Sequence, residues 1–146
     1  MRREIPTASR AQEVVTLFLP ALASLAFAGV AVAATPVKVE RSWTGHMPLA
    51  VAPLVQSSVS TTEAWQGVWA TCQMKGAAPT VDFEHKLVLV AVRRSSIVRF
   101  GEARLDNGNL TTSVTATPDA PGRMTCALAL VPRAGVRTVN GAPPGK

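Results

Sequence analysis

The sequence predicts an α+β domain that is mostly β, in which one helix packs on an antiparallel sheet of about five to seven strands. A sandwich-like closure of the strands is a variant of the same prediction. Three observations lead to it. An apolar run from Leu87 to Val92 is typical of a strand buried on both faces. Other segments alternate apolar and polar residues, and only residues 60–76 carry a helical pattern.

Residues 1–34 have the features of a secretory signal peptide. Arg2, Arg3 and Arg10 precede an uncharged stretch, residues 14–34, and Ala31-Val32-Ala33 fits a small-x-small cleavage site. We therefore expect export, with a mature protein that is periplasmic or extracellular. The alternative is an uncleaved membrane anchor, because a span needs roughly 20 apolar residues. Pro20 and the many alanines favour cleavage.

The charge of the chain is basic but scattered. There are 15 Lys and Arg against 9 Asp and Glu, a formal net charge of +6, and there is no Tyr. A nucleic-acid-binding surface would gather its cations on one patch, and no such patch with interleaved aromatic residues is evident, so we expect no nucleic-acid partner. The remainder is predicted to be one domain, residues 35–141, followed by a mobile tail, residues 142–146.

The segments before the helix predict two short strands. In a first strand Val37, Val39 and Arg41 alternate with Lys38, Glu40 and Ser42, and the strand is predicted to end at Trp43-Thr44-Gly45. Residues 46–53 are predicted to be a loop or a crossing at the sheet edge, and residues 54–60 a second short strand.

The helix is predicted from its start signal and its apolar face. Ser60 or Thr61 can be the N-cap, and Glu63 lies three residues after Ser60, as a capping box requires. Gly76 is placed to stop the helix, and Gly67 inside it is either tolerated or marks a close approach to a neighbour. The residues at helical spacing on the apolar face are Trp65, Val68, Trp69 and Cys72.

Strands and turns fill the rest of the chain. The predicted strands are the central one up to Val92 and residues 97–105, 110–117, 124–131 and 136–139. Asp106-Asn107-Gly108-Asn109 predicts a tight hairpin turn, because Asn and Gly accept positive φ. Residues 93–96, 118–122 and 132–135 are predicted turns.

The two cysteines are predicted to form a disulfide. An even number of cysteines in an exported chain favours pairing. Cys72 lies on the apolar helix face and Cys126 on the apolar side of its strand, so both point at one core. The alternative is two buried free thiols.

Catalytic and metal sites find little support in the sequence. Asp82, Glu84 and His85 are the densest group of possible ligands, but in a strand Asp82 and Glu84 would share a face that His85 opposes. The competing interpretation has Asp82 capping the turn after Pro79. A copper site from His46, Met47, Met74 and Met124 rests on residue type alone. We therefore expect no cofactor, no metal and no enzymatic activity.

The order of motifs resembles a known family. A Trp-bearing helix, TTEAWQGVW with Trp65 and Trp69, precedes VDFEHKLVLVAV and paired strands around an Asp-Asn-Gly turn. This pattern resembles the C-terminal domain of PrcB, a protease-complex accessory subunit. Phrases such as KVERSWTG and VPRAGVRTVNG are similar to exported proteins of planctomycetes. The resemblance covers residues 37–141, and its most specific part is Val81-Asp82-Phe83 with the apolar run behind it. It implies an accessory or binding role beside an exported protease and no catalytic residues.

The function expected from these observations is binding of another exported protein. The contact would be an exposed strand edge or a basic stripe on the hairpin between residues 93 and 104, formed by Arg93, Arg94, Arg99 and Arg104. Two alternatives stay open: a small exported hydrolase or metal-dependent enzyme, and a structural component of the cell envelope.

Overall fold

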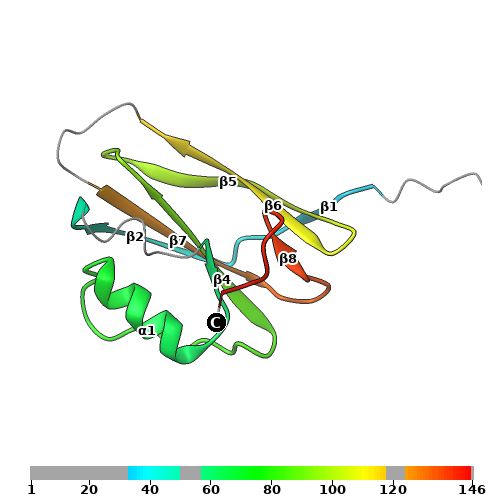
Figure 1. Ribbon diagram of the computed structural model, residues 1–146, viewed down its shortest axis with the longest axis horizontal. Helices are drawn as coiled ribbons and strands as arrows, with labels where there is room; N and C mark the ends of the chain where they lie inside the picture. The colour runs from blue at the N-terminus through cyan, green and yellow to red at the C-terminus, as the bar shows by residue number, and fades with distance from the viewer. Residues whose placement is uncertain (1–32, 50–56, 118–123, 146) are drawn as a thin grey trace, which may run out of the picture. The chain divides into compact units, whose positions relative to one another are not determined.

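The part of the protein that the structure describes folds as two four-stranded sheets and one helix (Figure 1). The computed structural model describes residues 33–49, 57–117 and 124–145, all within the unit Ala31–Lys146. The predicted signal peptide, residues 1–34, lies outside them apart from its last two residues. The elements are β1 (Thr35–Val37), β2 (Arg41–Met47), β3 (Ser58–Val59), α1 (Thr62–Thr71), β4 (Lys86–Arg93), β5 (Val98–Asp106), β6 (Asn109–Ala116), β7 (Met124–Pro132) and β8 (Thr138–Val139).

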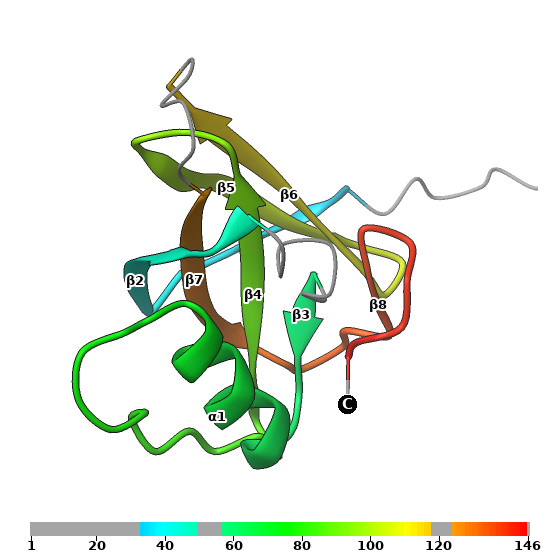
Figure 2. The same ribbon diagram turned by 60° about the vertical axis from the view of Figure 1, so that its left-hand side comes forward.

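The strands divide into sheet A, in the order β1-β5-β6-β8, and sheet B, in the order β2-β7-β4-β3. Neighbouring strands are antiparallel except for β6 and β8, which are parallel. Helix α1 covers one face of sheet B and sheet A covers part of the other (Figure 2). The predicted fold class is confirmed. The single sheet of the prediction is replaced by its sandwich-like variant.

The central strand β4 is buried on both faces, as its apolar run predicted. Val88 and Val90 face α1, whereas Leu87 and Leu89 pack with residues of sheet A. Strand β7 is its longest partner and alternates in the same way, with Leu128 toward α1 and Ala129 toward sheet A. Leu87, Val88 and Leu89 are each at most 1% exposed, so this strand pair is the hydrophobic centre of the domain.

The predicted first strand is in fact two strands in different sheets. Val37 and Val39 pack against the sheet A core, whereas Trp43 packs against α1, so the chain crosses between the sheets near residues 38–40. Val37, Val39 and Trp43 are separated by even numbers of residues, which is why the sequence indicates one strand. Gly45 was predicted to end the strand but lies inside β2. It is a glycine there because a Cβ would overlap the Cys72 carbonyl oxygen. His46 N–H donates to that oxygen at 3.0 Å.

Helix α1 begins and presents its apolar face as predicted. Thr61 is the N-cap, and its hydroxyl accepts the Ala64 N–H at 3.3 Å. The predicted apolar face, which includes Trp65 and Trp69, lies in the core against sheet B. The helix ends earlier than predicted, because Gln73 at φ +49° forms the left-handed residue that closes it. Its N–H and that of Met74 donate to the carbonyls of Ala70 and Trp69.

Gly67 lies on the exposed side of α1 with nothing within 4 Å of a Cβ built there. It is therefore tolerated and marks no close approach. We expect Gly67→Ala to raise the free energy of unfolding by about 1 kcal/mol, because Ala loses less backbone entropy in a helix. Gly76 is the matched control. Its Cβ position is equally open, but its φ is +75°, so Gly76→Ala should be destabilising. Urea unfolding of both variants tests this; equal shifts would contradict it.

A disulfide joins Cys72, at the end of α1, to Cys126 in β7, as predicted. Their Cα atoms are 6.0 Å apart and both side chains are fully buried. The bond fastens the helix to the middle of sheet B across the aromatic core.

The C-terminal parts follow the prediction in the hairpin and differ in the tail. Asn107 and Gly108 have φ of +48° and +83°, which makes the tight turn between β5 and β6. Two residues of the predicted mobile tail, residues 142–146, form β-bridges, Ala142 with Val139 of β8 and Gly145 with Val59 of β3. The Gly145 carbonyl accepts the Ser60 N–H at 2.9 Å and the Ser60 hydroxyl at 2.8 Å. Residues 50–53 of the predicted loop, residues 54–56 of the predicted second strand and the predicted turn 118–122 lie outside the described residues.

Candidate functional site

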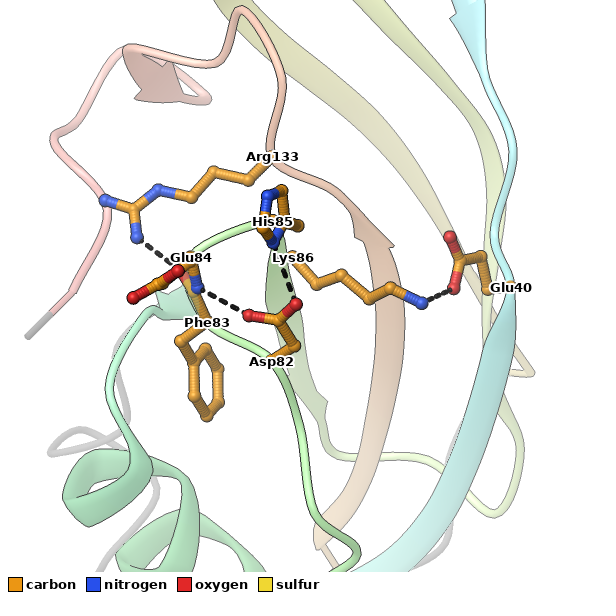
Figure 3. Close-up of polar contacts among 7 residues, drawn as sticks. All are labelled: Glu40, Asp82, Phe83, Glu84, His85, Lys86 and Arg133. Carbon is orange, nitrogen blue, oxygen red and sulfur yellow. Dashed lines mark hydrogen bonds and ion pairs between the residues drawn. The ribbon is translucent and has the colours of Figure 1, made fainter.

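The polar group predicted around Asp82 forms a turn and not the start of a strand. The Asp82 carboxylate accepts the Glu84 N–H at 3.1 Å through Oδ1, and Oδ2 lies 2.8 Å from His85 Nδ1 (Figure 3). The Asp82 carbonyl accepts the N–H groups of His85 and Lys86. The prediction that His85 would oppose Asp82 is therefore wrong, because alternation applies only in extended backbone. The capping role of Asp82 is confirmed.

Charged side chains on other elements hold this turn in place. The Arg133 guanidinium donates to the Phe83 carbonyl at 2.7 Å, and the Arg133 N–H donates to the His85 carbonyl at 2.8 Å. Lys86 pairs with Glu40, next to β2, and each side chain is about a third exposed. The turn is thus fixed from both sides, by the β7–β8 loop and by the segment before β2 (Figure 3).

The electrostatics of the turn centre on Asp82. The hydrogen bond from His85 is the main cause that holds the pKa of Asp82 below its ordinary value. Desolvation opposes this effect and raises the pKa, whereas the Glu84 N–H and the nearby His85 charge lower it further. Both side chains are open to solvent, His85 at 75% and Asp82 at 57% exposed.

This pKa has a consequence for stability. A carboxyl whose pKa is lower in the folded state stabilises the fold above its unfolded pKa, and this contribution is lost as the pH falls through the folded pKa. We expect the stability difference between the wild type and Asp82→Asn to shrink as the pH falls below 3.8, the ordinary pKa of an aspartate. We also expect His85→Ala to raise the pKa of Asp82, as read from its carboxyl ¹³C shift. An unchanged Asp82 titration in that variant would show that His85 is not the cause.

A hollow of about 540 Å³ lies beside the turn. Its apolar lining includes Trp43, Val81 and Leu130, and its charged lining includes Asp82 and the Glu40–Lys86 pair. Asp82 is already engaged by His85 and by a backbone N–H, and Lys86 by Glu40. Arg41, the remaining charged residue of the lining, is exposed and forms no ion pair within the described part of the chain. The other charges of the hollow are paired within the fold and hold the turn in place.

Asp82, Glu84 and His85 nevertheless converge. One ligand atom from each lies within 4.8 Å of the others, and all three residues are exposed. These are the residues that could hold a metal ion, and the turn rather than a strand brings them together. An ion bound there would compete with the Glu84 N–H and with His85 for the two Asp82 oxygens.

The other predicted ligands are not brought together. Met47 and Met124 are partners across β2 and β7 and pack in the core under α1, together with Met74. His46 lies on the opposite face of its strand, with Nδ1 3.4 Å from Thr125 Oγ1. The three methionines therefore lie on the face of sheet B that α1 covers, and His46 lies on the other face.

The four arginines of the predicted partner surface do not share a hairpin. Arg93 ends β4 in sheet B, whereas Arg99 and Arg104 lie in β5 of sheet A, so the predicted hairpin is wrong. Ser95 shapes the crossing, because its buried hydroxyl lies within hydrogen-bonding distance of the Ile97 and Thr117 carbonyls. All four side chains are exposed, and Arg104 pairs with Glu102 at 2.9 Å.

Two residues that position these surfaces were missed by the sequence analysis. Trp43 was assigned to a turn but packs with Trp65 and Trp69 at ring-centroid distances of 5.4 and 5.9 Å. Arg133 was assigned to a turn without a role. Trp43 follows Val39 and Arg41 at two-residue spacing, and this spacing could have indicated that Trp43 lies in a strand and not in a turn.

No protein-family model, curated protein or solved structure matches the chain. Among the described residues, no helix is long and apolar enough to cross a bilayer.

Proposed function

We propose that this is an exported protein whose domain binds another exported protein and has no catalytic activity of its own. The PrcB-like order of motifs supports an accessory role beside an exported protease. The disulfide between Cys72 and Cys126 is compatible with an oxidising compartment. Cleavage after residues 1–34 belongs to this proposal, and the mass of the exported protein tests it.

The observation that carries the proposal is the open edge of sheet A. Strand β1 pairs only with residues 103–105 of β5, so residues 98–102 have no strand on that side within the described part of the chain. An unpaired strand edge is a general route to recognition of a second chain.

The hydroxyl and thiol groups of the described core support a non-catalytic role. Both cysteines are bonded to each other. The hydroxyls of Ser60 and Ser95 donate to backbone carbonyls. His85 binds Asp82 through Nδ1, and within the described part of the chain no hydroxyl or thiol forms a hydrogen bond with its other ring nitrogen.

Capture of partners from an envelope fraction tests this function. The full chain with a C-terminal tag is immobilised and washed at moderate salt. We expect one dominant retained protein, with 1:1 binding when it is purified. A column that retains nothing across salt concentrations would contradict the proposal.

The convergence of Asp82, Glu84 and His85 favours one alternative, a metal-dependent enzyme. A thermal shift with Zn²⁺ or Mn²⁺ that disappears in Asp82→Asn would support that alternative. Because both Asp82 oxygens already accept hydrogen bonds in the turn, we expect no such shift.

A further inference from the structure

The open edge of β5 is specific in its backbone geometry. Thr117 N–H donates to the Ile97 carbonyl at 3.1 Å, and antiparallel strands alternate between bonded and outward-facing residues. The N–H and C=O groups of Val98 and Phe100 therefore point away from β6, toward the side that β1 leaves empty. Farther along, the same side of β5 is occupied by β1, with Val37 opposite Ala103. This edge of β5 is thus paired with β1 at residues 103–105 and unpaired at residues 98–102.

A slot lies next to the empty half. A hollow of about 340 Å³ separates residues 98–101 of β5 from Ser42, Trp43 and Thr44 of β2. Val39, Phe100 and Ala127 give it apolar walls. Ser42 and Thr44 are exposed although they lie on the opposite side of β2 from Trp43, which faces α1. Sheet A therefore stops short of covering this part of sheet B.

The cations near the slot lack partners in the described part of the chain. Arg99 on β5 and Lys38, where β1 ends, are exposed and form no ion pair there. The two nearest carboxylates in the sequence are already used, Glu40 by Lys86 and Glu102 by Arg104. A chain that entered the slot would meet unpaired positive charge, so acidic side chains fit it best.

We propose that the slot binds a short acidic segment of a partner protein, which pairs as an extra strand with Val98 and Phe100 of β5. This deepens the proposed function and rests on it. The added strand would occupy the place that β1 leaves empty, put alternate side chains over Phe100 and Ala127, and place the others near Arg99.

Strand β1 limits what can fit. A strand that pairs with residues 98–102 must end or turn away at residue 102, because Val37 already occupies the position opposite Ala103. The paired part is therefore about five residues, roughly 17 Å of extended chain. A second copy of β5 would bring another Arg99 to an edge that already carries unpaired positive charge, so the occupant is a segment of another protein.

The test is binding of labelled octapeptides to the full chain, followed by fluorescence anisotropy. In the first peptide Glu alternates with Val, and in the second Lys alternates with Val. Two further peptides are versions of the Glu peptide with every second backbone nitrogen methylated, one at the odd positions and one at the even positions. We expect the Glu peptide to bind at least about tenfold more tightly than the Lys peptide, and one of the two methylated peptides to lose about tenfold in affinity, because it lacks the N–H groups that pair with β5.

Two charge reversals locate the site. Arg99→Glu should weaken binding of the Glu peptide about tenfold, whereas Arg94→Glu, a matched exposed arginine outside the slot, should change it less than about twofold. Equal effects of the two variants, equal binding of the two unmethylated peptides, or no binding at all would overturn the proposal. Dimerisation of the full chain that Arg99→Glu abolishes would also overturn it, in favour of a second copy.

The outcome separates this inference from the function on which it rests. If the immobilised chain retains a partner and Arg99→Glu retains it equally well, the slot is not the contact and protein binding stands. If neither wild type nor variant retains a partner, the proposed function itself fails.

Discussion

Removal of the disulfide should lower the free energy of unfolding by roughly 4 kcal/mol. The bond closes a loop with a sequence separation of 54 residues, and a cross-link of that length restricts the unfolded chain by about this amount. The change is Cys72→Ala with Cys126→Ala, and the measurement is urea unfolding of the exported protein. Because both side chains are fully buried, the two alanines should add a further cost from lost packing.

The single variants give the control for this experiment. Cys72→Ala breaks the bond and leaves Cys126 as a buried free thiol, so it should be almost as unstable as the double variant. The two single changes should therefore be far from additive. A double variant that loses less than about 1 kcal/mol would show that the helix is held mainly by its other contacts.

The sequence predicted well those elements whose own residue pattern is enough to show which side chains are buried. Trp65 and Trp69 lie on a single helix face, and the run from Leu87 is buried on both sides, so their periodicity is sufficient. The Asn107-Gly108 turn was predicted because positive φ is a property of the residues themselves.

The features that the sequence could not predict depend on which sheet a strand joins. Val37, Val39 and Trp43 are in phase, yet Val37 packs in sheet A and Trp43 under α1. Arg41 is a polar residue at the position between them where an apolar one is due, and by itself it does not indicate a change of sheet. The predicted hairpin from Arg93 to Arg104 is wrong for the same reason. The sequences of β4 and β5 do not show that the two strands belong to different sheets. The slot itself exists only because β1 leaves β5 after Val37.

The candidate site was therefore predicted in its residues and not in its geometry. Asp82, Glu84 and His85 were identified as the densest polar group, but a turn fixed by Arg133 places their side chains together. The partner surface was predicted as an exposed strand edge or a basic hairpin. The hairpin does not exist. The sequence does not show where the open strand edge lies, how many residues it has or which charges are near it, because these depend on how β1 pairs with β5.

Trp65→Ala should lower the free energy of unfolding by about 3–5 kcal/mol, as expected for truncation of a large buried aromatic residue. Trp65 is 1% exposed, and its ring lies 5.4 Å from Trp43 and 5.1 Å from Trp69. Its indole N–H also donates to the Pro79 carbonyl at 2.8 Å, which attaches the segment before Asp82 to the helix. The measurement is urea unfolding, with near-ultraviolet circular dichroism as a report on aromatic packing.

Trp65→Phe separates packing from the hydrogen bond. Phe keeps much of the aromatic contact but leaves the Pro79 carbonyl without its donor, so we expect a cost between that of the wild type and that of Trp65→Ala. Trp43→Ala is the matched control, because Trp43 belongs to the same aromatic group but is only partly buried, and it should cost less than Trp65→Ala. Equal costs for the two alanine variants would mean that the aromatic group acts as one unit. The segment from Pro79 to Asp82 would then depend on the whole group and not on the single hydrogen bond from Trp65.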